Sequence, residues 1–149
     1  APRLADERGI EVTESKTRQT EDFQSLVRVT VHNGEESLAV EGTLFAGDDP
    51  RIVRIDGFRV DAVPYGHTLV ARNTDEPGVI GFIGTVLGEH DVNIAGMFNA
   101  RETQGGEALT VYNLDQAVPE AAVETLLDDA RIVEVTEITL DDAGVRDAA

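Results

Sequence analysis

The chain has 149 residues, 41% of them hydrophobic, with no cysteine and a net charge of −17 from 12 basic and 29 acidic residues. This length suits one ordinary domain or two small ones, and the missing cysteine excludes disulfides, thiol nucleophiles and cysteine-held metal clusters. The charge disfavours nucleic acid as a partner, because phosphate contacts need lysine and arginine. No apolar run approaches the roughly 18 residues of a membrane span, and no signal-peptide pattern is present. We therefore expect a cytoplasmic protein that binds no membrane.

Residues 1–65 predict a β-rich, antiparallel part of a domain. Residues 1–8 are typical of a helix that stops at Gly9, and a helix end without a start predicts a piece of a longer protein. Asn33-Gly34 and Asp56-Gly57 are strong hairpin signals between alternating segments. The expected strands cover residues 10–13, 25–32, 37–45, 51–55 and 58–63.

Pro64-Tyr65-Gly66 marks a boundary, after which strands alternate with helices. Pro77 and Pro119 are each expected at the first position of a helix, where the missing N–H of proline would be unpaired anyway. The strands are expected at 67–73, 92–101, 107–114 and 131–139, and the helices at 77–89 and 119–129. The order βαββαβ predicts a ferredoxin-like module over residues 66–140, with four antiparallel strands and two helices on one face, followed by a flexible tail at 141–149. The chain is therefore assigned to the α+β class.

Each expected helix has one apolar face at helical spacing, which we expect to be buried. The faces comprise Val79, Ile80, Ile83, Val86 and Leu87 in the first helix, and Ala122, Val123, Leu126 and Leu127 in the second. The first helix also carries several glycines, but no GxGxxG follows a strand, so a dinucleotide site is not indicated. These glycines are Gly78, Gly81, Gly84 and Gly88, and we expect them to allow close approach to the sheet or to contact a partner.

Three polar residues, Asn73, Asp75 and Asn93, lie at joints between expected elements, where their side chains are free to face a ligand. Asp75 can instead cap the following helix, since aspartate is favoured there, and Asn93 can be a simple turn residue. The three histidines are scattered without ligand spacing, so we expect no metal site.

The segment from Asp75 to Gly81, together with Gly84–Gly88 and Val92–Ala95, resembles the ACT domain of the D-3-phosphoglycerate dehydrogenase family. Upstream, three segments resemble the second part of the intervening, allosteric substrate-binding domain of the same family. They are residues 1–5, 42–45 and 52–57. The resemblance therefore implies an intervening-domain part at residues 1–65 and an ACT domain at residues 66–140.

The resembled family oxidises 3-phosphoglycerate with NAD, on the route to L-serine. The catalytic and NAD-binding domains are absent from this chain, so the resemblance implies a regulatory region with no catalytic residue and no cofactor of its own. In the family, L-serine binds where two ACT domains of a homo-oligomer meet. By motif position, the residues implied here are Asn73, Asp75 and Asn93.

The chemistry of a free amino acid such as L-serine fits these positions. Its ammonium group needs a carboxylate, which Asp75 can supply. Its own carboxylate needs donors, which the Asn93 amide and the backbone N–H groups near Gly78 and Val79 can supply.

The resemblance also implies an anion site in the upstream domain, lined by basic side chains. Arg51, Arg54 and Arg59 are the candidates, with Arg51 at the best-matching position. Phe58 and Val63 stand where some relatives carry arginine. The alternative is a solvated sheet face on which these arginines balance the many carboxylates.

Two rival functions stay open at this level. In one, the modules only hold an oligomer together by pairing side by side through edge strands. In the other, the pair of modules resembles the small part of an iron–sulfur L-serine dehydratase, whose cluster this cysteine-free chain cannot hold alone. The acidic residues are spread along the chain rather than gathered in a tail, which indicates a protein from a salt-loving organism.

Overall fold

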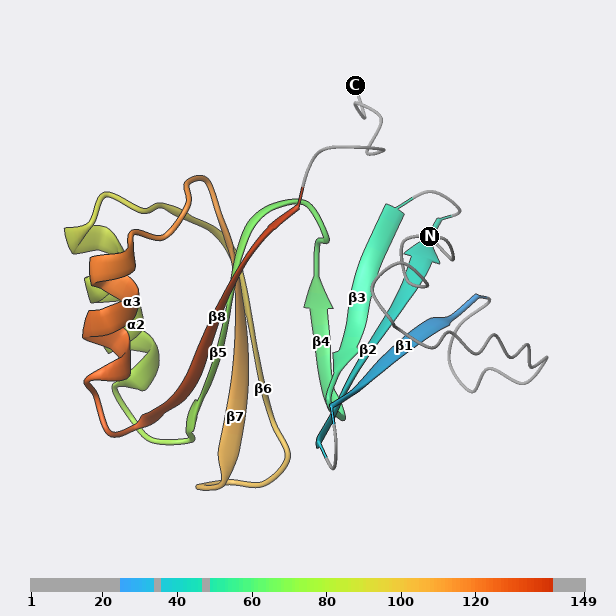
Figure 1. Cartoon of the computed structure of the whole chain (residues 1–149), viewed down its shortest axis with the longest axis horizontal. Helices are drawn as coiled ribbons and strands as arrows, with labels where there is room; N and C mark the ends of the chain where they lie inside the picture. Colours follow the sequence, from blue (N-terminus) through green and yellow to red (C-terminus); the bar gives the residue numbers. More distant parts are fainter. Residues whose placement is uncertain (1–24, 34–35, 47–48, 141–149) are drawn as a thin grey trace.

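The computed structural model describes residues 25–33, 36–46 and 49–140 (Figure 1). The helix end expected at residues 1–8, the strand at 10–13 and the tail at 141–149 lie outside the described residues.

The first half of the described chain forms an antiparallel sheet in the order β1-β2-β3-β4, which we call the meander sheet (Figure 1). Asp56 and Gly57 form the turn between the last two strands, both with positive φ, as the hairpin signal predicts. The strands are β1 (Val27–Asn33), β2 (Glu36–Phe45), β3 (Asp49–Ile55) and β4 (Phe58–Ala62).

The second half forms a sheet in the order β6-β7-β5-β8, which we call the helix-covered sheet. Every neighbouring pair in it is antiparallel, and both helices cover the same face, on the left of Figure 1. The elements are β5 (Gly66–Thr74), α2 (Val79–Glu89), β6 (Ile94–Arg101), β7 (Glu107–Leu114), α3 (Glu120–Leu127) and β8 (Ile132–Leu140). This arrangement confirms the α+β class and the ferredoxin-like βαββαβ order. No helix within the described ranges is long and apolar enough to cross a membrane.

The helix starts differ from the predicted ones. Gly78 has φ +91, which a right-handed helix does not allow, so α2 begins at Val79 and Pro77 lies outside it. Pro119 is the residue that precedes α3 in an extended conformation, rather than its first residue. The strand predicted from residue 92 begins only at Ile94, because the N–H of Val92 still bonds the carbonyl of Leu87 at the end of α2.

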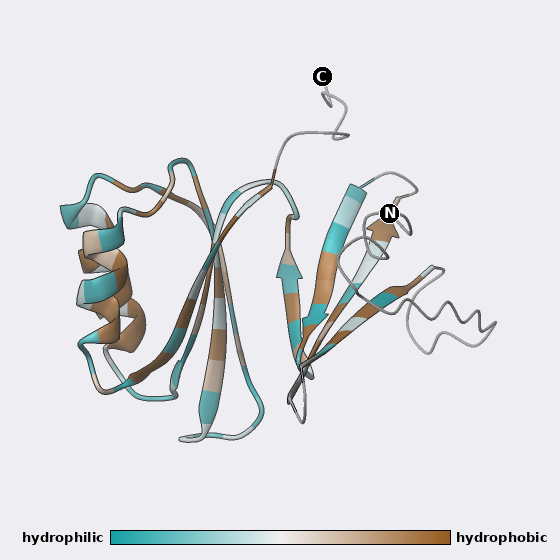
Figure 2. Ribbon diagram, in the orientation of Figure 1, coloured by the Kyte–Doolittle hydropathy of each residue, from teal (hydrophilic) through white to brown (hydrophobic). Residues whose placement is uncertain are grey.

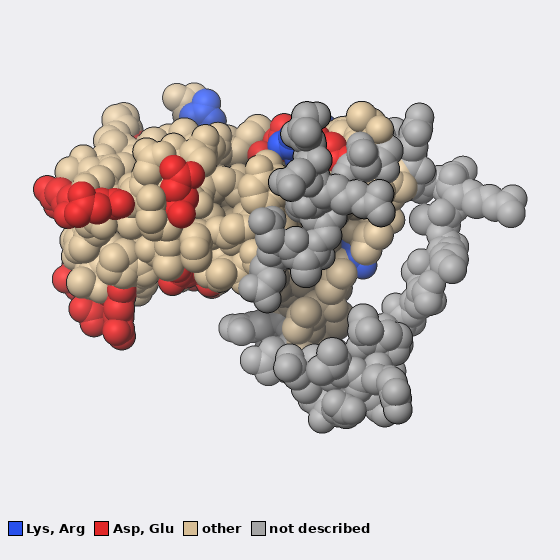
Figure 3. All heavy atoms as spheres, turned by 90° about the horizontal axis from the view of Figure 1, so that it is seen from above, with Lys and Arg blue, Asp and Glu red and all other residues tan. Residues whose placement is uncertain are grey.

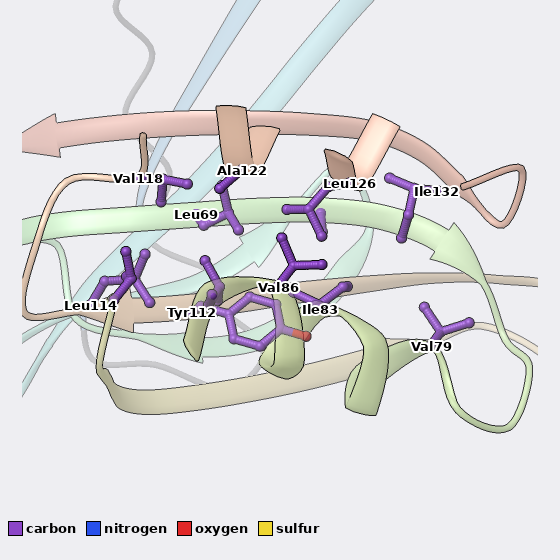
Figure 4. Packing of buried hydrophobic residues seen from close by; sticks show 13 residues of the cluster. Leu69, Val79, Ile83, Val86, Tyr112, Leu114, Val118, Ala122, Leu126 and Ile132 are labelled. Carbon is purple, nitrogen blue, oxygen red and sulfur yellow. The ribbon is translucent and has the colours of Figure 1, made fainter. Parts of the chain in front are cut away.

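A core of apolar side chains lies between the helices and their sheet (Figure 4). Two predicted members are wrong: Ile80 is 40% exposed and Leu127 is 50% exposed, because each lies at the margin of its helix's apolar face. The fully buried centre consists of Leu69, Ala71, Val79, Ile83, Val86, Leu87, Tyr112, Ala122 and Leu126.

A second core joins the two sheets. Alternate residues of β4, namely Phe58, Val60 and Ala62, pack against Leu109 and Val111 on the face of the helix-covered sheet that the helices leave open. Figure 2 shows hydrophobic residues along both β4 and β7 as well as on the helices. The meander sheet is therefore fastened to the helix-covered sheet by shared apolar burial, which is the largest favourable term in folding.

The connection between the sheets is also held by hydrogen bonds. The side-chain amide of Asn113 on β7 donates to the carbonyl oxygen of Val63 at 2.9 Å and to the hydroxyl of Thr68 at 3.3 Å. The N–H of Val63 donates back to the Asn113 carbonyl oxygen at 3.4 Å.

Candidate functional site

Asn73 lies near the end of β5 and is only 3% exposed. It continues the alternation of Leu69 and Ala71, whose side chains face the helices. Its side-chain nitrogen donates to the carbonyl oxygen of Thr74 at 2.7 Å, but its buried Oδ1 has no hydrogen-bond partner. Since an unsatisfied buried acceptor costs about 1–3 kcal/mol, this oxygen is suited to receive a donor from a small ligand.

The short loop that follows β5 leads directly into α2. The helix has no side-chain cap and no acidic residue in its first turn. Its first N–H groups lack partners within the helix, and the positive end of the helix dipole favours an anion there. The Val79 N–H has only a weak 3.5 Å contact with the carbonyl of Glu76. The helix start therefore leaves backbone donors near Gly78 and Val79 without side-chain partners, and carboxylate binding there stays a prediction.

Arg131 is a neighbour of this helix start that the sequence reasoning missed. A Cβ atom placed on Gly78 would lie 3.8 Å from Arg131 Nη1. The guanidinium lies over the Phe82 ring at 5.6 Å and donates to both carboxylate oxygens of Asp129, at 2.9 and 2.6 Å. These bonds lower the pKa of Asp129 to about 2. The only sequence signal was the Asp-x-Arg spacing in the loop before β8.

Asp75 is engaged within the protein, so the predicted helix-capping alternative is wrong. Its Oδ2 accepts from the N–H of Gly105 at 3.0 Å and from Arg101 Nη1 at 2.7 Å. The Gly105 bond first, and the Arg101 bond second, lower the pKa of this carboxyl below its ordinary value. Asp75 therefore ties the loop before α2 to the hairpin between β6 and β7, and it meets an ammonium group only in competition with Arg101.

Asn93 lies just before the start of β6, whereas Arg101, the partner of Asp75, is the last residue of that strand. Its side-chain nitrogen donates to Asp115 at 2.6 Å, and its backbone N–H donates to Gln116 at 2.8 Å. Because β6 has 8 residues and a strand rises about 3.3 Å per residue, Asn93 and the Asp75–Arg101 pair lie roughly 25 Å apart in one chain. One copy therefore groups Asn73, Asp75, Gly78 and Val79, and it leaves Asn93 out.

Tyr112 is a buried polar residue that the sequence gave no reason to single out. It is 0% exposed, and burial raises the pKa of its hydroxyl to about 12, against a smaller lowering effect of Thr110. In Figure 4 its ring is drawn against α2, with the hydroxyl toward Ile83. It stays protonated at any physiological pH.

The three candidate anion-binding arginines do not form one cluster of free cations. Arg51 binds Asp49 at 2.9 Å and Asp61 at 3.4 Å, and the hydrogen bond with Asp49 raises its pKa. Arg54 lies 3.4 Å from the buried carboxylate of Glu41 and stands opposite Arg59 in the β3–β4 register. The anion site stays a prediction. In the described part of the chain, no group of three or more Asp, Glu or His side chains is arranged to hold a metal ion.

Comparison with known proteins matches two consecutive parts of the chain to family models. Residues 1–56 match the D-3-phosphoglycerate dehydrogenase intervening domain, and residues 67–131 match the ACT domain. The chain is 35% identical over 139 residues to the D-3-phosphoglycerate dehydrogenase of Archaeoglobus fulgidus. This chain is homologous to D-3-phosphoglycerate dehydrogenases over their intervening-domain and ACT-domain matches.

Other D-3-phosphoglycerate dehydrogenases match this chain over a similar number of residues. The enzyme of Methanocaldococcus jannaschii is 32% identical over 140 residues, and that of Bacillus subtilis 34% identical over 137 residues. These matches cover 94% and 92% of this chain but only 26% of each relative. The chain thus spans about a quarter of the length of the curated dehydrogenases that it matches, and it corresponds to their intervening and ACT domains.

Proposed function

We propose that this chain is the regulatory part of an NAD-dependent D-3-phosphoglycerate dehydrogenase, and that two copies of its ACT domain bind L-serine between them for feedback control. The observation that carries the proposal is the buried, unpartnered Oδ1 of Asn73 beside the uncapped start of α2. Together they supply an acceptor for an ammonium group and backbone donors for a carboxylate, which are the two charged ends of any free amino acid.

The separation of Asn93 from the rest of the site fits a pocket between two copies. β6 is an edge strand of its sheet, so its outer side is available for pairing. If two β6 strands pair antiparallel about a two-fold axis, the start of each strand lies beside the end of the other. Asn93 of the second copy then comes beside the Asp75–Arg101 end of the first, and the pocket is complete only in the dimer.

The glycines of α2 support the same pairing. The predicted close approach to the sheet does not apply to Gly81, Gly84 and Gly88, because an added Cβ on any of them meets nothing within 4 Å. Their open side is instead free to receive a neighbouring helix. A ligand that prefers one arrangement of two such domains shifts the population toward it, which is sufficient for feedback control.

The test is isothermal titration of the chain with L-serine, with glycine, L-alanine and D-serine as comparison ligands. We expect L-serine to bind, and Asn73→Ala to remove most of the affinity. Thr125→Ala is a suitable control, since the Thr125 hydroxyl bonds the Ala121 carbonyl on the exposed side of α3. The absence of both heat and any rise in melting temperature with L-serine would reject the proposal, because a ligand of the native state must stabilise it.

A purely scaffolding role is the second candidate, and one observation favours it. The carboxylate of Asp75 and the side-chain amide of Asn93 are already bonded to Arg101 and Asp115 within the same chain. Sedimentation velocity with and without L-serine separates the two functions. A dimer whose stability does not change with any of the amino acids tested supports the scaffolding role.

A further inference from the structure

Arg72, the residue before Asn73, is held by the meander sheet. Its guanidinium forms an ion pair with Asp56 in the β3–β4 turn and lies over the Phe58 ring at 5.8 Å. Its Nε lies 3.6 Å from Glu134 on β8, and its Nη1 lies 4.0 Å from Glu107 on β7. With 22% of its side chain exposed, Arg72 is fixed from three directions by described residues.

Asp56 is itself anchored in the meander sheet. Its N–H donates to the carbonyl oxygen of Ala39 on β2 at 2.8 Å, and its Oδ1 accepts from the N–H of Ala39 at 3.1 Å. Its other carboxylate oxygen binds Arg72. A single carboxylate therefore links β2, the β3–β4 turn and β5.

The strand changes register at this point. Arg72 pairs with Glu134 on β8, but Asn73 pairs with Ile132, so Val133 of β8 is the extra residue of a bulge. The pairing of β5 with β7 continues without a shift through Arg72 and Asn73. Successive side chains of a strand point to opposite faces of its sheet. Arg72 points toward the meander sheet, and Asn73 points toward α2.

We propose that Arg72 is a positioning residue for the candidate amino-acid site. Its clamp on Asp56 holds the backbone of β5 where the pairing with β8 is irregular, and this backbone sets the direction of the Asn73 side chain. The clamp thus connects the ligand site on one face of the helix-covered sheet to the meander sheet on the other. The ligand part of this inference rests on the proposed function, whereas the clamp is a property of the chain itself.

The first experiment needs no ligand. The side-chain amide of Asn73 is followed by NMR in Arg72→Met, which keeps the length but loses the charge, and in Asp56→Asn, which keeps an acceptor for Ala39. We expect both variants to shift this resonance and to speed its hydrogen exchange. Arg28→Met is the matched control. Arg28 lies on the distant strand β1, its side chain is 63% exposed, and it pairs with Glu41 on β2. An Asn73 amide that is the same in all four proteins overturns the proposal.

The second experiment measures L-serine affinity in the same set and in the Arg72→Met/Asp56→Asn double variant. We expect each single variant to weaken binding by about five-fold or more. The double variant should lose no more than the single ones, because the two residues act as one unit. Equal affinity in wild type and variants overturns the coupling. If the wild type binds no amino acid, the proposed function fails, and the first experiment alone decides whether Arg72 positions Asn73.

Discussion

At the scale of single residues, the Asp75 carboxylate ties the loop before α2 to the hairpin between β6 and β7. Because its pKa is below the ordinary 3.8, the stability that it contributes is complete above that pH and is lost as the pH falls through the lowered pKa. We predict that the Gly105 amide stays protected from exchange below pH 3.8 in the wild type. In the wild type, this protection should be lost only as the pH falls through the lowered pKa of Asp75. In Asp75→Asn the same amide should exchange several-fold faster at neutral pH, and it should show no such loss of protection in acid.

Asp61→Asn on β4 is the control for losing one negative charge, because the 55% exposed Asp61 contacts Arg51 and not the loop before α2. Hydrogen exchange of the Gly105 amide, measured by NMR between pH 2 and 7, tests both variants. A Gly105 amide that behaves alike in wild type and Asp75→Asn contradicts the assigned role of this carboxylate.

The same residue marks where sequence reasoning stops. The motif located the loop, since proline, glycine and polar residues between apolar segments are local signals. It did not reveal that Asp75 was already satisfied, because Arg101 is 26 residues away and Gly105 is 30 residues away along the chain. Nor did it distinguish Asn73, whose oxygen lacks a partner, from Asn93, whose amide has one. Whether a polar group is free depends on tertiary contacts.

At the scale of elements, period and turn signals carried most of the information. Strands 107–114 and 132–140 and both helices lie within a few residues of their predicted ranges, because alternation and helical spacing are properties of a short segment. The start of α2 was misjudged because the positive φ of Gly78 overrides the preference of Pro77 for a first helical turn. The packing of β4 on β7 was not predicted, since nothing local specifies which surface covers an open sheet face.

The glycines inside α2 give a prediction at this scale. Gly84 has an ordinary negative φ and open space around its missing Cβ. Gly84→Ala should therefore stabilise the isolated chain by about 0.5–1 kcal/mol, the usual helical advantage of alanine over glycine. Urea denaturation at low protein concentration measures this change. If the glycine face packs against a second copy, the same variant should weaken self-association in sedimentation experiments.

Gly78→Ala is the opposite case and serves as the control. Its φ of +91 is strained for any side chain, so this variant should destabilise the chain. Destabilisation by Gly84→Ala at a concentration where the chain is monomeric would mean that its Cβ meets an obstacle, against the open surroundings described above.

At the scale of the whole molecule, the shared core joins the two sheets, so we expect them to unfold as one cooperative unit. Phe58 is 5% exposed and packs on Leu109 and Val111 across the boundary. We predict that Phe58→Ala costs about 3–5 kcal/mol of unfolding free energy and lowers the exchange protection of β7 as well as of β4. Val29→Ala, at a side chain that is 56% exposed, should be close to neutral. Loss of protection in β4 alone would show that the two sheets unfold independently.

Charge affects the molecule as a whole, because the acidic side chains that give 149 residues a net charge of −17 repel one another. Figure 3 shows acidic side chains gathered over the helix-covered end of the visible face. The screening length falls from about 10 Å at 0.1 M salt to about 3 Å at 1 M, so repulsion between distant carboxylates is removed over this range. Short ion pairs such as Asp75–Arg101, at 2.7 Å, are weakened much less. The melting temperature should therefore rise with sodium chloride, most steeply at low concentration, and sucrose at matched osmolarity should not reproduce that steep early rise. A melting temperature that falls with salt would mean that the local ion pairs outweigh the long-range repulsion.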